Sequence, residues 1–299
     1  MRKLLRLPRI LHGTLLRAAQ HDCLNLAQST AYSAMVALFP ALIVAAAVIS
    51  LVPDTTPLRF QLSAFFDRIL PPDVSPLLEG YFVDSPNSPR SSHALIAAFI
   101  VSLIGASSVV ATLMEGVRRA NELPENCWTF WQRRRRALLL VPLSLVPFVL
   151  ATTFIVFGQF FTGWLARHLV PSARTPFYTL VLLIRWAVAL AGSIGIVGLI
   201  YHMGTPIQQS WKRVVPGAIV STAMWFPSTL IFGWYVTRFA NYSQVYGSLG
   251  AGIALLFWLY IISLSVLCGA EFNTEFHARF HHPHQTHSNP SPPNTLPPV

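Results

Sequence analysis

Long apolar stretches separated by short polar connections form the main pattern of this chain. A helix needs about 20 mainly apolar residues to cross the roughly 30 Å hydrocarbon core of a bilayer. Six stretches reach that length, and only the connection over residues 53–93 is long. The pattern predicts an all-α polytopic membrane protein with six transmembrane helices. We place them at Ala31–Val52, Ala94–Met114, Ala137–Phe161, Phe177–Met203, Val214–Val236 and Val245–Ala270.

Two flanking segments complete the predicted organisation into residues 1–30, 31–270 and 271–299. In the first, five Lys and Arg residues are mixed with leucines, which is typical of an amphipathic helix on a membrane face. A helix that packs against the bundle fits this pattern equally well. A second amphipathic helix is expected at Leu58–Ile69, within the outward loop. The segment 271–299 is rich in Pro, His, Ser and Asn toward its end, so we expect a largely disordered cytoplasmic tail.

The composition excludes a soluble protein. Apolar residues make up 53% of the 299 residues and charged residues only 11%, whereas soluble domains have about 25% charged residues. Such a chain could not cover a water-exposed surface with polar groups. The three cysteines, Cys23, Cys127 and Cys268, are far apart in the sequence. We therefore expect neither a disulfide framework nor a cysteine metal site.

The distribution of basic residues predicts the orientation. Fourteen Lys and Arg residues fall in the amino-terminal segment, the second and fourth connections and the tail, and six fall in the other connections. Because Lys and Arg accumulate in cytoplasmic loops, both termini are predicted to be cytoplasmic. The four arginines Arg133–Arg136 precede the third span, where they would attract anionic lipid headgroups. Topology thus explains most of the net charge of +10.

Arg185 is the one strong charge well inside a predicted span, about 12 Å from its outer end by helical rise. The predicted spans contain no carboxylate at that depth. The guanidinium either extends to the outer headgroups or contacts an anion, such as a solute or a lipid phosphate.

Glu115 and Glu271 end the second and sixth spans on the cytoplasmic side, where the negative end of the helix dipole disfavours a carboxylate. Each therefore needs a cation. One interpretation is a structural ring of ion pairs, and the other is a cytoplasmic gate or proton-coupling site. The cations at the same level are Arg118, Arg119, Lys212 and Arg213.

Several weaker signals concern packing and binding. Prolines interrupt three spans, and small residues spaced four apart predict close helix contacts. The outer segment Tyr242–Gly252 is either a re-entrant turn lining a cavity or a simple turn, and its candidate residues are Asn241, Tyr242, Tyr246 and Gly247. Histidines from His281 to His287 are interpreted as an incidental polar tract, and we expect no metal and no cofactor. The small pairs are Ala41 with Ala45, Ala191 with Gly195, and Ser248 with Gly252.

The stretches WKRVVPGAIVSTAMW, NYSQVYGSLGAGIALLFWLY and LCGAEFN resemble the YihY/BrkB family of bacterial inner-membrane proteins, as does STAYSAMVALFPALIV in the first span. The resemblance extends from Ala27 to Phe276. It implies six transmembrane helices, a bacterial cytoplasmic membrane and a permease or envelope-lipid role. The matching motif residues are Pro216, Gly217, Tyr242, Tyr246, Gly247, Gly250, Trp258, Tyr260, Gly269 and Glu271, with Asn121 a less secure counterpart of a family asparagine.

These observations predict a permease, or a lipid or solute transporter of the cell envelope, that is not an enzyme. A non-transporting scaffold or lipid-binding envelope protein is the alternative. Members of the family have been called ribonuclease BN-like, but the acids of this chain are scattered and offer no general acid and base for phosphodiester hydrolysis. The expected partners are membrane lipids with anionic headgroups at the cytoplasmic face, with no nucleic acid and with a possible homo-oligomer.

Overall fold

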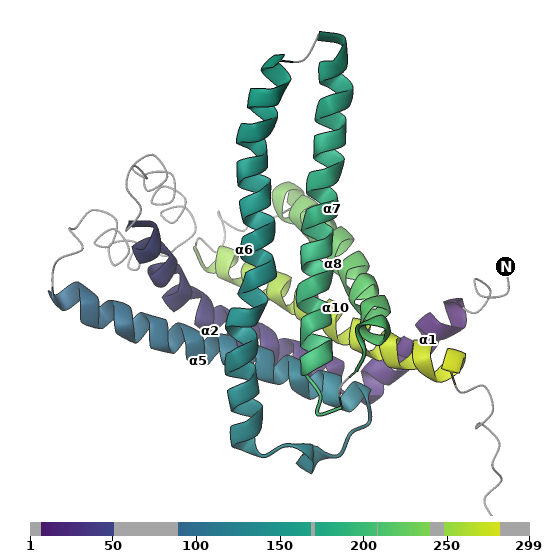
Figure 1. Ribbon diagram of the computed structural model, residues 1–299. Coiled ribbons are helices and arrows are strands. Elements are labelled where there is room, and N and C mark those ends of the chain that lie inside the picture. The colour runs from purple at the N-terminus through teal and green to yellow at the C-terminus, as the bar shows by residue number, and fades with distance from the viewer. Residues whose placement is uncertain (1–6, 51–88, 169–170, 208, 240–247, 282–299) are drawn as a thin grey trace, which may run out of the picture.

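The computed structural model describes residues 7–168, 171–207, 209–239 and 248–281, apart from 51–88 (Figure 1). All the regular structure in these residues is helical, which confirms the all-α fold class. The elements are α1 (Leu7–Gln20), α2 (Cys23–Ser50), α5 (Pro89–Ala120), the short 3-10 helix η2 (Glu125–Cys127), α6 (Phe130–His168), α7 (Pro171–Met203), α8 (Trp211–Phe239) and α10 (Ser248–His281).

Five helical segments in the described part of the chain are long and apolar enough to cross a membrane. They correspond to the first, second, fourth, fifth and sixth predicted spans. The third predicted span lies within α6, which continues through Pro142 and Pro147. Because many side chains of α6 lie outside the described part, the count of six spans stays a prediction. The five segments are Cys23–Ala45, Leu95–Ala120, Thr175–Met203, Trp211–Tyr235 and Gly252–Ala278.

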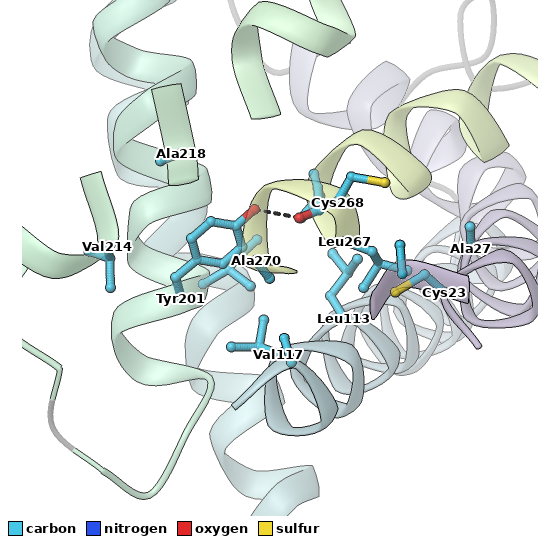
Figure 2. Close-up of a cluster of buried hydrophobic side chains, with 14 residues drawn as sticks. Cys23, Ala27, Leu113, Val117, Tyr201, Val214, Ala218, Leu267, Cys268 and Ala270 are labelled. Carbon is cyan, nitrogen blue, oxygen red and sulfur yellow. Dashed lines mark hydrogen bonds between the residues drawn. The ribbon is translucent and has the colours of Figure 1, made fainter. Parts of the chain in front are cut away.

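The helices converge at one end of the bundle, which we call the closed end. There the start of α2, the ends of α5 and α7, the start of α8 and the second half of α10 share one buried cluster. Figure 2 shows Cys23, Leu113, Tyr201 and Leu267 pointing into this cluster from four different helices. Helices α2 and α8 therefore run away from the closed end, whereas α5 and α7 run toward it, as expected for successive membrane spans.

The helices separate away from the closed end. Figure 1 shows the α6–α7 hairpin extending in one direction and α2 with α5 in another. Large apolar side chains are exposed along these helices, as expected for surfaces in contact with lipid. They include Phe99 and Ile104 on α5, Leu150 on α6, Leu183 on α7 and Ile231 on α8.

Glycines permit close contact between α8 and α10 at the closed end. A Cβ atom added to Gly217 of α8 would lie 2.5 Å from the carbonyl oxygen of Gly269 and 2.6 Å from the Cβ of Asn273. One added to Gly269 would lie 2.6 Å from the hydroxyl of Tyr201 and 2.7 Å from the Cβ of Ser221. Only residues without a Cβ allow α7, α8 and α10 to meet this closely.

The amino-terminal helix combines both interpretations of its sequence. Ile10, Thr14 and Ala18 are buried, and α1 packs on α10 and α2. Leu11 and Leu15 are exposed on another face. The chain then turns sharply at Asp22, whose φ is 63°. This turn places the start of α2 at Cys23, eight residues before the predicted start of the first span.

Several predictions fall on residues outside the described part of the chain. These are the amphipathic helix at Leu58–Ile69, the turn residues 241–247 and the tail from residue 282. Ser248–Gly252 forms the beginning of α10, and α10 continues beyond the predicted span end at Ala270 to His281.

Candidate functional site

A buried carboxylate lies at the centre of the closed end. The side chain of Glu271 on α10 is fully buried, with 0% of its surface exposed. Its Oε1 accepts a hydrogen bond from Nδ1 of His21 at 2.7 Å, and the Sγ of Cys23 lies 3.8 Å from the same oxygen. Its Oε2 lies 3.9 Å from Nε of Arg17. Because an unpaired buried charge is costly, the carboxylate depends on these partners.

Arg17 links three acidic side chains through one guanidinium. Besides Glu271, it pairs with Glu275 on α10, where Nη1 and Oε2 are 3.3 Å apart, and with Glu122 beyond the end of α5. Arg119 donates from α5 to the backbone oxygen of His21 at 3.3 Å. The end of α1 and the turn after it are therefore held by charged contacts to both α5 and α10.

Glu115 forms a second ion-pair cluster with cations from α5 and α6. Its Oε1 lies 2.7 Å from Nη2 of Arg118 and 3.2 Å from Nε of Arg119, and its Oε2 lies 3.4 Å from Nη1 of Arg133. The pairing of Glu115 with Arg118 and Arg119 agrees with the sequence prediction. Arg133 adds a contact that joins α5 to α6.

The prediction that Glu271 needs a cation is confirmed, but its partners are not among the four cations placed at its level from the sequence. Lys212 and Arg213 make no ion pair with it, and Arg17 and His21 take this place. The reason is tertiary, since His21 and Glu271 are 250 residues apart in the sequence. The short polar sequence R-A-A-Q-H-D between two apolar helices was the signal that could have revealed them, because two basic residues four apart lie on one helix face.

An apolar cavity lies along α8 and α10 and reaches the edge of the closed end, although the two helices still touch beside it, where the rings of Phe232 and Phe257 are 5.7 Å apart between centres. It has a volume of about 750 Å³. Ser265, the lining residue nearest the closed end, precedes Glu271 by about 9 Å of helix. Polar lining groups are few, namely two serines and the polar atoms of Trp234 and Tyr235. The apolar lining includes Met224, Ile231, Phe232, Ile253, Phe257, Ile261 and Leu264.

The other predicted site residues lie elsewhere or outside the described part. Arg185 is half-buried on α7, about 24 Å of helix from Tyr201 in the closed-end cluster. It therefore belongs to neither ion-pair cluster. Asn241, Tyr242, Tyr246 and Gly247 lie outside the described residues.

Together, the apolar helices and the sequence comparisons define a multi-pass helical membrane protein. The chain belongs to the family described as Virulence factor BrkB, which matches residues 14–294. This membership confirms the resemblance seen in the YGSLG and GAE motifs.

Two relatives cover nearly the whole chain. A Bacillus subtilis protein named "Putative ribonuclease-like protein YfkH" is 27% identical over 88% of this chain and 93% of its own length. A UPF0761 membrane protein of Alteromonas mediterranea is 25% identical over 94% of this chain and 92% of its own. No solved structure matches the chain.

Proposed function

We propose that this protein is a permease that moves a lipid or another amphipathic solute of the cell envelope across the cytoplasmic membrane, without hydrolysing it. The observation that carries the proposal is the contrast within one helix pair. α8 and α10 line an apolar cavity of about 750 Å³ over one half of their length, and it is open on the side where Ile231 and Ile253 are exposed. Over the other half they are in contact through glycines. Such a cavity suits acyl chains or other apolar groups.

In this proposal the closed end is the cytoplasmic gate. Glu271, His21 and Arg17 bind α1 to α10 there, and the close contact at Gly217 and Gly269 leaves no passage between α8 and α10. Opening toward the cytoplasm requires α1 to separate from Glu271. An ion pair can serve as such a gate. The buried charges are stable only when paired, whereas water can solvate them once α1 moves away.

The orientation rests on the basic residues. The closed end carries Arg17, Arg118, Arg119 and Arg133, and we place it at the cytoplasmic face with both termini. Phe130 and Trp131 are exposed beside the basic run, and the guanidinium of Arg136 lies 4.4 Å from the ring centre of Trp128. Aromatic and basic side chains together favour a headgroup interface with anionic lipids.

Reporter fusions test this orientation. A reporter that is active only in the cytoplasm should be active at the carboxyl terminus and inactive in the loop near Asp73. The reverse assignment, or the same result at both positions, would contradict the proposed orientation.

Hydrolysis is not part of the proposal. The ribonuclease-like name belongs to the Bacillus relative and gives no mechanism. In this chain Glu115 and Glu271 are each engaged by arginine or histidine, which leaves neither of them arranged as a general base beside a substrate. A scaffold that binds lipid without moving it is the alternative function.

A cavity-filling variant distinguishes these functions. Ala254 lines the cavity, and Leu256 on the same helix does not. In proteoliposomes with fluorescent phospholipids, wild type should speed lipid movement between leaflets, as measured by dithionite quenching. Ala254→Phe should reduce that rate about tenfold by occupying the cavity, whereas Leu256→Phe should leave it within about twofold.

Binding of the labelled lipid is measured on the same preparations. Lipid that binds to wild type but crosses no faster than in protein-free vesicles would support the scaffold instead. Equal rates in both variants would show that the cavity is not the pathway.

A further inference from the structure

A second cavity, polar in character, lies at the closed end on another face of α10. It has a volume of about 240 Å³, far above the roughly 10–15 Å³ that holds one water molecule. Asn121 at the end of α5, Gln209 before α8, Arg213 on α8 and a face of α10 line it. The α10 residues are Asn273, Thr274, His277 and Ala278.

This cavity is separate from the Glu271 cluster. Two residues along a helix correspond to a rotation of about 200°, so Asn273 and His277 point away from the face that carries Glu271 and Glu275. The lining contains a guanidinium, an imidazole and three amides, and it contains no carboxylate. Among the described residues, Arg213 forms no ion pair, although Glu115, Glu122, Glu271 and Glu275 all do. The local charge is therefore positive.

Side chains of α10 form hydrogen bonds to the backbone at the start of α8, and these bonds fix the wall of the cavity. The backbone nitrogen of Gly217 donates to Oδ1 of Asn273 at 3.3 Å. Nε2 of His277 donates to the backbone oxygen of Arg213 at 2.9 Å. The preceding turn is fixed as well, because His202 stacks on Trp211 with ring centres 5.0 Å apart and donates from Nδ1 to the backbone oxygen of Gln209.

Asn273 presents a hydrogen-bond donor to the cavity. Only 6% of Asn273 is exposed. Because a backbone N–H requires an acceptor, its contact with Gly217 fixes Oδ1 on that side and leaves Nδ2 as the remaining donor. Nδ2 donates to no group in the described part of the chain, and since Asn273 lines the cavity this donor is available to a bound group. An acceptor from outside the chain would satisfy it.

We infer that this cavity binds a phosphate group, presented either by a lipid headgroup or by a free phosphate compound. The Arg213 guanidinium would supply two parallel hydrogen bonds, and Asn273 Nδ2 a third from another direction, which suits a tetrahedral oxyanion. The amino-terminal end of the α8 dipole adds positive potential. The inference does not depend on transport, because binding can be measured in protein that moves nothing.

The experiment uses the full-length protein in nanodiscs and three variants. Arg213→Gln removes the guanidinium at an exposed position and should not disturb folding. Asn273→Asp keeps the acceptor for Gly217 but replaces the donor with a carboxylate oxygen. Lys212→Gln is the matched control, because it removes a neighbouring exposed cation that does not line the cavity.

Two arms separate the sources of the phosphate. In one, radiolabelled pyrophosphate is titrated onto protein in phosphatidylcholine nanodiscs. In the other, retention of labelled phosphatidate is measured after exchange against phosphatidylcholine. In at least one arm, Arg213→Gln and Asn273→Asp should each weaken binding about tenfold, and Lys212→Gln should change it less than about twofold.

The arm that responds identifies the source. No binding of either probe to wild type would overturn the inference. An equal loss in Lys212→Gln and Arg213→Gln would also overturn it, since it would show diffuse attraction to basic charge instead of a built site. If wild type moves no lipid in the proteoliposome experiment, the phosphate-binding result still stands. The transport proposal and the phosphate site can therefore be rejected independently.

Discussion

The two halves of the α8–α10 pair have the same helices but opposite packing. At the closed end, Gly217 and Gly269 bring the backbones together, and Tyr201 of α7 donates to the backbone oxygen of Val266 within the same contact (Figure 2). In the other half, larger side chains such as Phe232 and Phe257 meet, with ring centres 5.7 Å apart, and an apolar cavity of about 750 Å³ lies beside them. The size of the side chains at the contact thus decides which half is closed.

The halves also differ in polarity. Buried charged and polar side chains concentrate at the closed end, where Glu271, Asn273 and Glu275 lie within about one turn of α10. The cavity is lined mainly by apolar groups. Burial of charge requires exact partners, whereas apolar contact tolerates many arrangements. We therefore expect the closed end to be sensitive to small changes and the cavity half to be tolerant.

The largest effect is expected at Glu271. Glu271→Gln keeps the shape of the side chain but removes the charge that Arg17 and His21 face, and breaking a buried pair costs about 3–5 kcal/mol. Glu275→Gln should cost clearly less, because the Glu275 side chain is 11% exposed whereas Glu271 is fully buried, and only Glu271 also pairs with His21. The measurement is the folded fraction after heating, read by size-exclusion chromatography in detergent. Equal losses would show that burial of Glu271 does not matter.

The next largest effect on stability is expected from replacing glycine by alanine in the two halves of α8. Gly217→Ala places a methyl group 2.5 Å from the oxygen of Gly269, and relieving such a clash costs about 1–3 kcal/mol. Gly233→Ala is the matched change at the other end of α8, where an added Cβ meets nothing within 4 Å. It should leave stability unchanged or slightly raised, because alanine favours helix. If thermal unfolding shifted equally in both, close contact would not distinguish the halves.

A smaller effect is expected at Tyr201. Tyr201→Phe removes the hydroxyl that donates to the backbone oxygen of Val266, which should cost about 1 kcal/mol. Tyr178→Phe on the exposed part of the same helix provides the control and should change little. Both are read as shifts in melting temperature. A shift at Tyr178 as large as that at Tyr201 would indicate a general response to loss of a tyrosine hydroxyl.

Particular residues show where prediction from sequence stopped. The pairing of Glu115 was predicted because Arg118 and Arg119 lie three and four residues away on the same helix. The partners of Glu271 were not predicted, because Arg17 lies on α1 and His21 in the turn that follows it, far from Glu271 in the sequence. Small-residue spacing was equally ambiguous, since an added Cβ at Gly195 meets nothing within 4 Å, whereas one at Gly217 or Gly269 would clash with a neighbouring helix.

The sequence by itself determined the helical membrane class and the approximate position of five spans, because the length of an apolar run is a local property that bilayer thickness converts directly into structure. Its family motifs also indicated the family to which the chain belongs. Only the tertiary structure decided which acid faces which cation, which glycines touch, and where cavities lie along α8 and α10. These features depend on how distant helices cross, and the apolar pattern along a single helix does not specify its partner.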